Sequence, residues 1–196
     1  MTNYNIYISG VGGQGIIKTS VIIGEAAMNE GLNVRMSEIH GMSQRKGSVS
    51  TELRIGECKS SIIPNHSADA ILSFEPIEVL RDLNKANKNT QIVFNTSPIH
   101  PSSLNTSQIN YPEIDEIIFS LKENFKNVFP IDGNELAIKA GNILSLNMVL
   151  LGAIAANEKF PLSKKSIIDA MKNNLNPKFH KLNLKAIEYG FDFIKH

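Results

Sequence analysis

A run of glycines directly after a β-prone segment constrains the fold of this chain more than any other feature. Residues 4–8 favour a strand, and the glycines that follow are Gly10, Gly12, Gly13 and Gly15. Residues 16–28 then carry apolar side chains near helical spacing, and residues 33–39 favour a second strand. A strand, a tight turn, a helix and a strand within about 35 residues predict a βαβ unit with a right-handed crossover.

The remainder of the chain divides into further strands and a helical C-terminal section. More β-prone segments are expected at residues 48–55, 60–63, 70–74, 91–95 and 128–131. We expect residues 60–63 to pair with the strand at 48–55, and the Ser-, Pro- and Asn-rich residues 96–112 to form an irregular connection. We therefore predict an α/β fold, Rossmann-like and doubly wound, with a mostly parallel sheet and a helical C-terminal section from about residue 135.

Length and composition limit what the chain can be. Its 196 residues fit a single domain spanning 1–196. The formal net charge is +1, so no bulk charge attracts nucleic acid or an anionic membrane. Cys58 is the only cysteine, which excludes an iron–sulfur cluster or zinc ribbon held by this chain alone. The apolar run at 143–156 is shorter than the about 20 residues of a membrane span, and no signal-like segment opens the chain, so we expect a cytoplasmic protein.

Residues 10–15 fit the pattern G-x-G-x-x-G between a strand and a helix, which is typical of phosphate binding. The second glycine lets the backbone approach a phosphate, and the start of the following helix favours an anion. A phosphate-loop NTPase is excluded because Ile16 stands where that motif requires lysine. A dinucleotide site would need an acidic residue after the second strand, and Glu38 is the nearest. The glycines alternatively serve only a tight turn against a packed helix.

The segment 40–47 leaves the carboxyl end of the second predicted strand, so we expect it at the same sheet edge as the glycine turn. Arg45 offers a planar fork of donors suited to phosphate or carboxylate, and Lys46 adds a point charge. Histidine is a common acid–base residue, but no Asp or Ser near His40 in the sequence completes a catalytic arrangement. A solvated polar loop is the alternative, although the density of Gly, Met and Gln favours packing at an interface.

Two further polar residues are expected near this edge. Glu75, followed by Pro76, lies at the exit of a buried strand and either hydrogen-bonds to the loops or starts a helix. Asn147 lies within an apolar helix and needs partners, which a backbone end near the sheet edge would supply. The remaining histidines lack metal-ligand spacing, and we predict neither a metal site nor a catalytic residue in this chain.

The glycine turn, followed by residues 37–49, resembles the gamma-type subunit of 2-oxoacid:ferredoxin oxidoreductases, most closely the small-subunit branch acting on indolepyruvate. Further matches in the order of that family are Ile63-Pro64, Phe74-Glu75-Pro76, Asn95-Thr96, Gly141-Asn142, Asn147 to Ala153, and Asn183 to Ala186. Lys46 departs from the family, which usually has a second glycine there. The candidate cofactor-binding residues are Gly10, Gly12, Gly13, Gln14, Gly15, His40, Gln44 and Arg45.

The resemblance implies oxidative decarboxylation of a 2-oxoacid to an acyl-CoA, with electrons passing to ferredoxin. It places thiamine diphosphate and the iron–sulfur clusters in a large partner subunit, so this chain alone binds no cofactor, and a coenzyme A contact stays open. Ferredoxin is reached through the complex, no nucleic acid or membrane partner is expected, and a homodimer of the isolated chain stays open. The alternatives are a free-standing NAD(P)-dependent reductase with Glu38 on the ribose, or a non-enzymatic interaction module.

Overall fold

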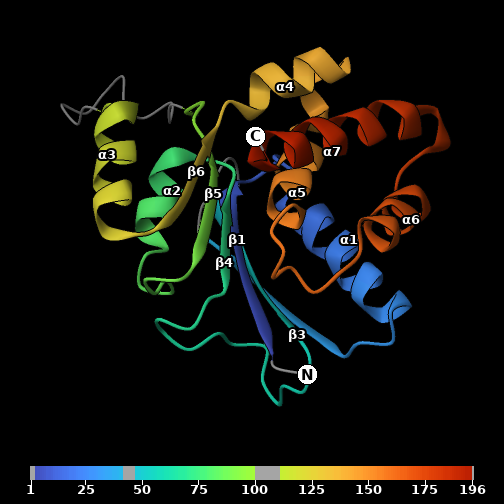
Figure 1. The fold of residues 1–196 in the computed structure, drawn as a ribbon, viewed down its shortest axis with the longest axis horizontal. Helices are drawn as coiled ribbons and strands as arrows, with labels where there is room; N and C mark the ends of the chain where they lie inside the picture. Colours follow the sequence, from blue (N-terminus) through green and yellow to red (C-terminus); the bar gives the residue numbers. More distant parts are fainter. Residues whose placement is uncertain (1–2, 42–46, 100–110, 196) are drawn as a thin grey trace.

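A six-stranded sheet forms the centre of the molecule (Figure 1). The computed structural model describes residues 3–41, 47–99 and 111–195. The strands lie in the order β2-β3-β1-β4-β5-β6. Their bounds are β1 Tyr4–Val11, β2 Val34–His40, β3 Ser48–Ile55, β4 Ala70–Ser73, β5 Gln91–Asn95 and β6 Asn127–Ile131.

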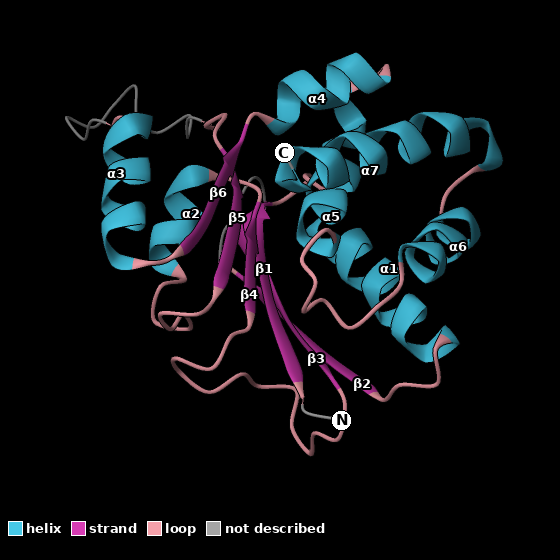
Figure 2. Ribbon diagram, in the orientation of Figure 1, coloured by secondary structure: helices cyan, strands magenta, loops and turns pink. Residues whose placement is uncertain are grey.

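Helices cover both faces of the sheet (Figure 2). Two of them, α2 (Pro76–Arg81) and α3 (Ile114–Asn124), pack on one face. The other face carries α1 (Ile16–Asn29), α5 (Leu146–Ala155), α6 (Lys164–Asn174) and α7 (His180–Lys195). A further helix, α4 (Gly133–Ala140), and the 3₁₀ helix η2 (Ile143–Ser145) join β6 to α5, while the 3₁₀ helix η3 (Pro177–Phe179) precedes α7. The expected helical C-terminal section is therefore present.

The sheet is mixed, and five of its strands run in one direction. β1 pairs with β4, β4 with β5, and β5 with β6, all parallel. β3 is antiparallel to both of its neighbours, β1 and β2. The predicted α/β architecture with a mostly parallel sheet is confirmed. The expected βαβ unit needs one correction: β1 and β2 run in the same direction, but β3 lies between them.

The expected strand at residues 60–63 is absent from the structure. The backbone of Ile63 instead hydrogen-bonds to two side chains: its N–H donates to a Glu52 carboxylate oxygen at 2.5 Å, and its carbonyl accepts from Lys85 Nζ at 2.7 Å. Glu52 and Lys85 also form a largely buried ion pair at 2.9 Å. Because side chains satisfy these backbone groups, the segment needs no strand partner, and β3 pairs with β2 and β1 instead.

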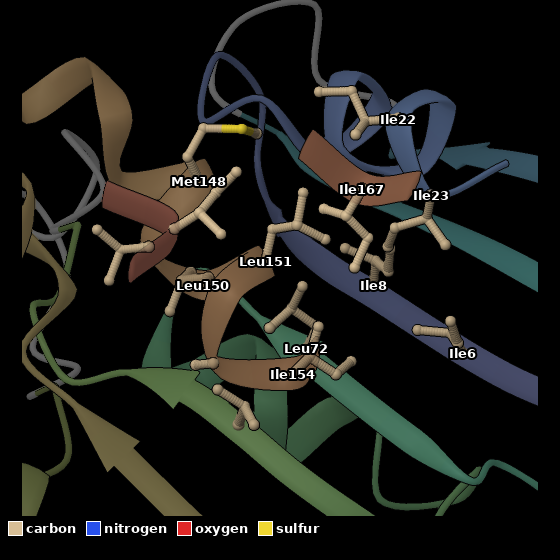
Figure 3. Packing of buried hydrophobic residues seen from close by; sticks show 14 of the residues in the cluster. Ile6, Ile8, Ile22, Ile23, Leu72, Met148, Leu150, Leu151, Ile154 and Ile167 are labelled. Carbon is tan, nitrogen blue, oxygen red and sulfur yellow. The ribbon is translucent and has the colours of Figure 1, made fainter. Parts of the chain in front are cut away.

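The main core lies between the sheet and α5 (Figure 3). Ile6 and Ile8 of β1 and Leu72 of β4 point toward Leu151 and Ile154 of α5, and all are fully buried. Successive side chains of a strand point to opposite faces of the sheet. The face of β1 toward α5 is therefore apolar, and Asn5, Tyr7 and Ser9 lie on its other face. Burying each aliphatic side chain contributes roughly 1.5–3 kcal/mol, which is enough to fix α5 across the strands.

Two glycines allow α5 and α7 to approach at backbone distance. A Cβ at Gly152 of α5 would overlap the carbonyl of Ile187, and a Cβ at Gly190 of α7 would overlap the carbonyl of Val149. Within the described part of the chain, no single helix is long and apolar enough to span a membrane. Only the pair formed by α4 and residues 143–155, bent by 119°, meets the length and composition criteria together, and α5 within it is buried in the core.

Candidate functional site

The glycine turn and the segment after β2 meet at one edge of the sheet. Val49 of β3 pairs with Gly10 of β1 on one side and with His40 of β2 on the other. Beyond the strands, the Gly12 N–H donates to the Gly47 carbonyl at 2.9 Å, and the Gly41 N–H donates to the Ser48 carbonyl at 2.8 Å. This edge holds the carboxyl ends of the parallel strands, where open α/β sheets bind ligands. We call it the carboxyl rim.

The predicted positions divide between described and undescribed residues. Gly10, Gly12, Gly13, Gln14, Gly15 and His40 all lie at the carboxyl rim. Gln44, Arg45 and Lys46 fall outside the residues that the structure describes, so their placement stays a prediction. The expected meeting of the two segments is nevertheless observed, because residues 41 and 47 flank that gap and both bond within the rim.

The glycines of the turn differ in their backbone conformation and in the space around them. Gly13 and Gly15 have φ of 99° and 90°, in the left-handed region that side chains disfavour. A Cβ at Gly10 would stand 2.7 Å from the Cβ of Phe74, the residue after β4, so a larger residue would clash there. A Cβ at Gly12 would meet nothing closer than the Gly47 carbonyl at 3.7 Å. The Cβ position of Gly13 has nothing within 4 Å, so Gly12 and Gly13 are the two positions of the turn with open space beside them.

Gln14 holds the turn against the end of β4. Its Oε1 accepts from the Val11 N–H at 2.7 Å, and its Nε2 donates to the Phe74 carbonyl at 2.9 Å. Both ends of the side-chain amide are thus engaged by the backbone of the rim. The sequence predicts Gln14 as a binding residue, and the structure gives it the role of positioning the turn.

The amino-terminal end of α1 faces the rim without a side-chain cap. Gly15 occupies its N-cap position, and no acidic residue lies in the first turn. The positive end of a helix dipole and its first N–H groups favour an anion there. Thr19 and Ser20 bond back to the carbonyls of Gly15 and Ile16, at 3.0 and 3.1 Å, so they leave those N–H groups alone.

Asn147 covers this helix start from α5. Its side chain is only 9% exposed, and its Nδ2 lies 2.9 Å from where a Cβ of residue 15 would stand. Within the described residues its amide makes no hydrogen bond, so the expectation that it satisfies a nearby backbone end is wrong. The amide therefore remains as an available donor and acceptor beside the glycine turn.

Glu75 combines both of its expected roles. Its Oε2 accepts from the N–H groups of Ile77 and Glu78, at 2.7 and 3.2 Å, and so caps α2. Its Oε1 accepts from the Tyr111 hydroxyl at 2.6 Å and from the Ile99 N–H at 3.3 Å. Burial, with the neighbouring carboxylate, raises the pKa of Tyr111. Glu75 thus ties the connection between β5 and α3 to the rim.

A buried polar cluster supports the rim from the face covered by α2, and no pattern in the sequence indicated it. The Ser9 hydroxyl donates to the Asp82 carboxylate and lies 3.1 Å from the Ser73 hydroxyl, which donates to the Glu75 carbonyl at 2.9 Å. Burial raises the pKa of Asp82 to about 7, with a further rise from Glu78, while Ser9 and Arg81 oppose it. Because Ser9 directly precedes the glycine turn, the cluster fixes the end of β1.

The site offers binding groups and lacks a catalytic arrangement in its described part. His40 is exposed, with Nε2 3.3 Å from the Glu38 carboxylate, and no nucleophile adjoins the pair. No group of three or more His, Cys, Asp or Glu side chains that could hold a metal ion occurs within residues 3–41, 47–99 and 111–195. Chemically, the rim can receive an anion at α1 and a hydrogen-bonding group at Asn147.

The chain is similar to known proteins over nearly its whole length. Residues 5–193 match the family model described as pyruvate ferredoxin/flavodoxin oxidoreductase. The chain is 55% identical to indolepyruvate oxidoreductase subunit IorB of Methanothermobacter thermautotrophicus, over 96% of each chain.

Two solved structures share the fold. The gamma subunit of a keto/oxoacid ferredoxin oxidoreductase from Geobacter sulfurreducens matches with a TM-score of 0.72 and 24% identity over 98% of each chain. A 2-oxoglutarate:ferredoxin oxidoreductase from Magnetococcus marinus, solved with 2-oxoglutarate, coenzyme A and succinyl-CoA bound, matches with a TM-score of 0.73 and 21% identity. That match covers 100% of this chain and 31% of the other, so the same fold occurs there as one part of a longer chain.

Proposed function

The chain belongs to the pyruvate ferredoxin/flavodoxin oxidoreductase family, and we propose that it is the small subunit of a heteromeric 2-oxoacid:ferredoxin oxidoreductase acting on indolepyruvate or a related aryl pyruvate. The reaction is the oxidative decarboxylation of the 2-oxoacid to an acyl-CoA, with the electrons passing to ferredoxin. The observation that carries the proposal is 55% identity, over 96% of both chains, to a protein named as an indolepyruvate oxidoreductase subunit.

The residues of this chain do not fit the redox cofactors of such an enzyme. Its single cysteine cannot hold an iron–sulfur cluster, and the described residues form no metal-binding group. Thiamine diphosphate supplies the decarboxylation chemistry, and the clusters carry the electrons. We assign both to a larger partner subunit, which passes electrons to ferredoxin. The small subunit then acts through binding and positioning, and it is inactive alone.

The carboxyl rim is the proposed contact with coenzyme A. Its phosphates would meet the start of α1 and the open position at Gly12, and the Asn147 amide would donate beside them. A helix amino terminus contributes only about 0.3–1 kcal/mol to anion binding. Most of the affinity must therefore come from cations, either Arg45 of the segment after β2 or groups of the partner. The residues proposed for this contact from the sequence are Gly10, Gly12, Gly13, Gln14, Gly15, His40, Gln44 and Arg45. Gln14 would act by holding the turn in place, and Asn147 is added from the structure.

The free-standing NAD(P)-dependent reductase is the less favoured function. That reading requires Glu38 at the end of a strand directly beside β1, where it would reach the ribose of a dinucleotide bound at the glycine turn. In this sheet β3 separates β2 from β1, and Glu38 lies beside His40 instead. A non-enzymatic interaction module would have the same fold. An activity assay of the chain together with the larger subunit distinguishes that function from the proposed one.

The whole chain, residues 1–196, is proposed as one functional domain. The family match runs through both the sheet and the helical section, and α5 packs on the strands that carry the glycine turn. We also propose a cytoplasmic location, since the reaction depends on a ferredoxin as electron acceptor.

Co-expression with the larger subunit from the same genome tests the function. We expect the two chains to co-purify, and the complex to reduce ferredoxin or methyl viologen with indolepyruvate faster than with pyruvate or 2-oxoglutarate, in the presence of coenzyme A. Substrate preference for a non-aromatic 2-oxoacid would contradict the substrate class, and absence of a complex would contradict the role as subunit.

A further inference from the structure

Three aliphatic side chains are exposed together where α4 turns into η2. Leu144 is 81% exposed, Ile138 64% and Ile143 44%. We call these three residues the apolar turn. Single exposed aliphatic residues are ordinary on a protein surface, but adjacent ones that large are typical of interaction sites.

Hydrogen bonds hold the apolar turn in one conformation. The N–H groups of Gly141 and Asn142 both donate to the Ala137 carbonyl at 3.1 Å. The Asn142 side-chain oxygen accepts from the Leu144 N–H at 2.9 Å, and the Ser145 hydroxyl donates to the Asn142 carbonyl at 2.7 Å. Because the turn is already ordered, docking it onto a partner costs little conformational entropy.

The chain that follows the apolar turn runs directly into the carboxyl rim. Asn147, three residues beyond Leu144, lies over Gly15 at the start of α1. Leu146 packs on Gly133, whose N–H donates to the Asn95 side chain at the end of β5, at 3.0 Å. The apolar turn therefore borders the candidate site.

The charge of the surface restricts what it can bind. Lys139 is the only charged residue between Ala137 and Asn147, and its Nζ lies 5.3 Å from the ring centroid of Tyr189 on α7. The cation is thus directed onto α7. An aliphatic surface with so little charge suits the apolar centre of a protein–protein interface and does not suit nucleic acid.

We propose that the apolar turn docks onto the larger subunit and seals the carboxyl rim against it. This inference rests on the proposed function and adds the surface that makes the contact. In the longer Magnetococcus marinus chain the same fold takes up 31% of the length, so there it is covalently joined to the rest of a 2-oxoglutarate:ferredoxin oxidoreductase chain. Here the partner would be a separate chain, which must be held by surface contacts, and the apolar turn is continuous with the edge that the partner must complete.

The test compares two glutamate substitutions at exposed apolar residues. L144E changes the apolar turn, and F119E changes α3, where Phe119 is 65% exposed on the opposite face of the sheet. Each purified variant is titrated against the purified larger subunit, and Kd is measured by calorimetry or interferometry. We expect L144E to weaken binding at least tenfold and F119E to change it less than threefold. Thermal unfolding of each variant alone, with an unchanged midpoint, checks that the fold is retained.

The possible outcomes distinguish failure of the docking surface from failure of the proposed function. Wild-type affinity for L144E, or an equal loss for F119E, overturns the docking surface while leaving the proposed function intact. A wild-type chain that does not bind the larger subunit contradicts the proposed function itself. If L144E abolishes only self-association of the isolated chain, a second copy covers the apolar turn and the proposal is wrong. Hydrogen exchange of the wild-type complex provides an independent readout, with new protection expected at residues 138–146.

Discussion

The side chain of Asn147 lies on the backbone of Gly15, so that α5 and the start of α1 are in direct contact at the carboxyl rim. The amide Nδ2 stands 2.9 Å from the position a Cβ of residue 15 would take. This contact brings a hydrogen-bonding group from the helical section to the glycine turn of the sheet section. The sheet section and the helical section therefore both contribute residues to the carboxyl rim.

The contact predicts different costs for two glycine-to-alanine substitutions. G15A places a Cβ against Asn147 on a backbone with φ of 90°, so we expect a loss of about 1–3 kcal/mol in the free energy of unfolding. G12A is the matched control, because its Cβ meets nothing within 3.7 Å, and we expect a change within about 0.5 kcal/mol. Denaturant unfolding of the isolated chain measures both, and equal losses would contradict the described geometry.

Asn147 is predicted to affect coenzyme A more than the 2-oxoacid. N147D places a carboxylate beside the start of α1, where it repels a phosphate, so we expect the KM for coenzyme A to rise on the order of tenfold. The KM for the 2-oxoacid should remain unchanged. Steady-state kinetics of the complex measure both constants. N124D, which adds the same charge at the end of α3, is the control, and a rise in both KM values for N147D would contradict a phosphate contact.

Asp82 predicts a decline in stability as the pH rises. Burial raises the pKa of its carboxyl to about 7 in the folded chain, against 3.8 as the ordinary value. Between those values the folded state binds the proton more strongly than the unfolded state does, so the contribution of Asp82 is fully present below about pH 4 and is lost as the pH rises through 7. D82N stays neutral and keeps an acceptor for Ser9. We expect D82N to remove this slope in urea unfolding between about pH 4 and 7. An unchanged slope in the variant would assign the effect to another group.

The close approach of α5 and α7 predicts opposite effects for two helical glycines. G152A forces the backbone of α7 away at Ile187, so we expect a loss of at least about 3 kcal/mol in the free energy of unfolding. Gly24 lies in α1 with nothing near its Cβ position, and G24A should stabilise the chain by about 0.5–1 kcal/mol. Thermal unfolding compares them, and a tolerated G152A would show that the two helices are not held at this distance.

The local signals of the sequence led to the correct architecture and rim. The glycine turn follows a strand and precedes a helix, and the segment after β2 lies beside it, as Val49 demonstrates by pairing with both Gly10 and His40. These features depend on short stretches of chain. The prediction of a strand at 60–63 was wrong because two side chains distant in the sequence, those of Glu52 and Lys85, hydrogen-bond to the backbone of Ile63.

The remaining features of the site depend on contacts between distant residues. A strand pattern at 48–55 does not indicate which strands lie beside it, so the insertion of β3 between β1 and β2 could not be read from the pattern. The Asp82 cluster combines β1, β4 and α2, and its residues are unremarkable in the sequence. Asn147 did carry a signal, as a polar residue in an apolar helix, but its position over Gly15 follows from how α5 crosses the sheet.

Reduction of ferredoxin with indolepyruvate and coenzyme A tests the division of labour most directly. The assay compares the isolated chain, the isolated larger subunit and the reconstituted complex at equal concentrations. We expect no turnover by the isolated chain and turnover by the complex, well above that of the larger subunit alone. Turnover by the isolated chain, or full activity of the larger subunit without it, would contradict the proposed role of the small subunit.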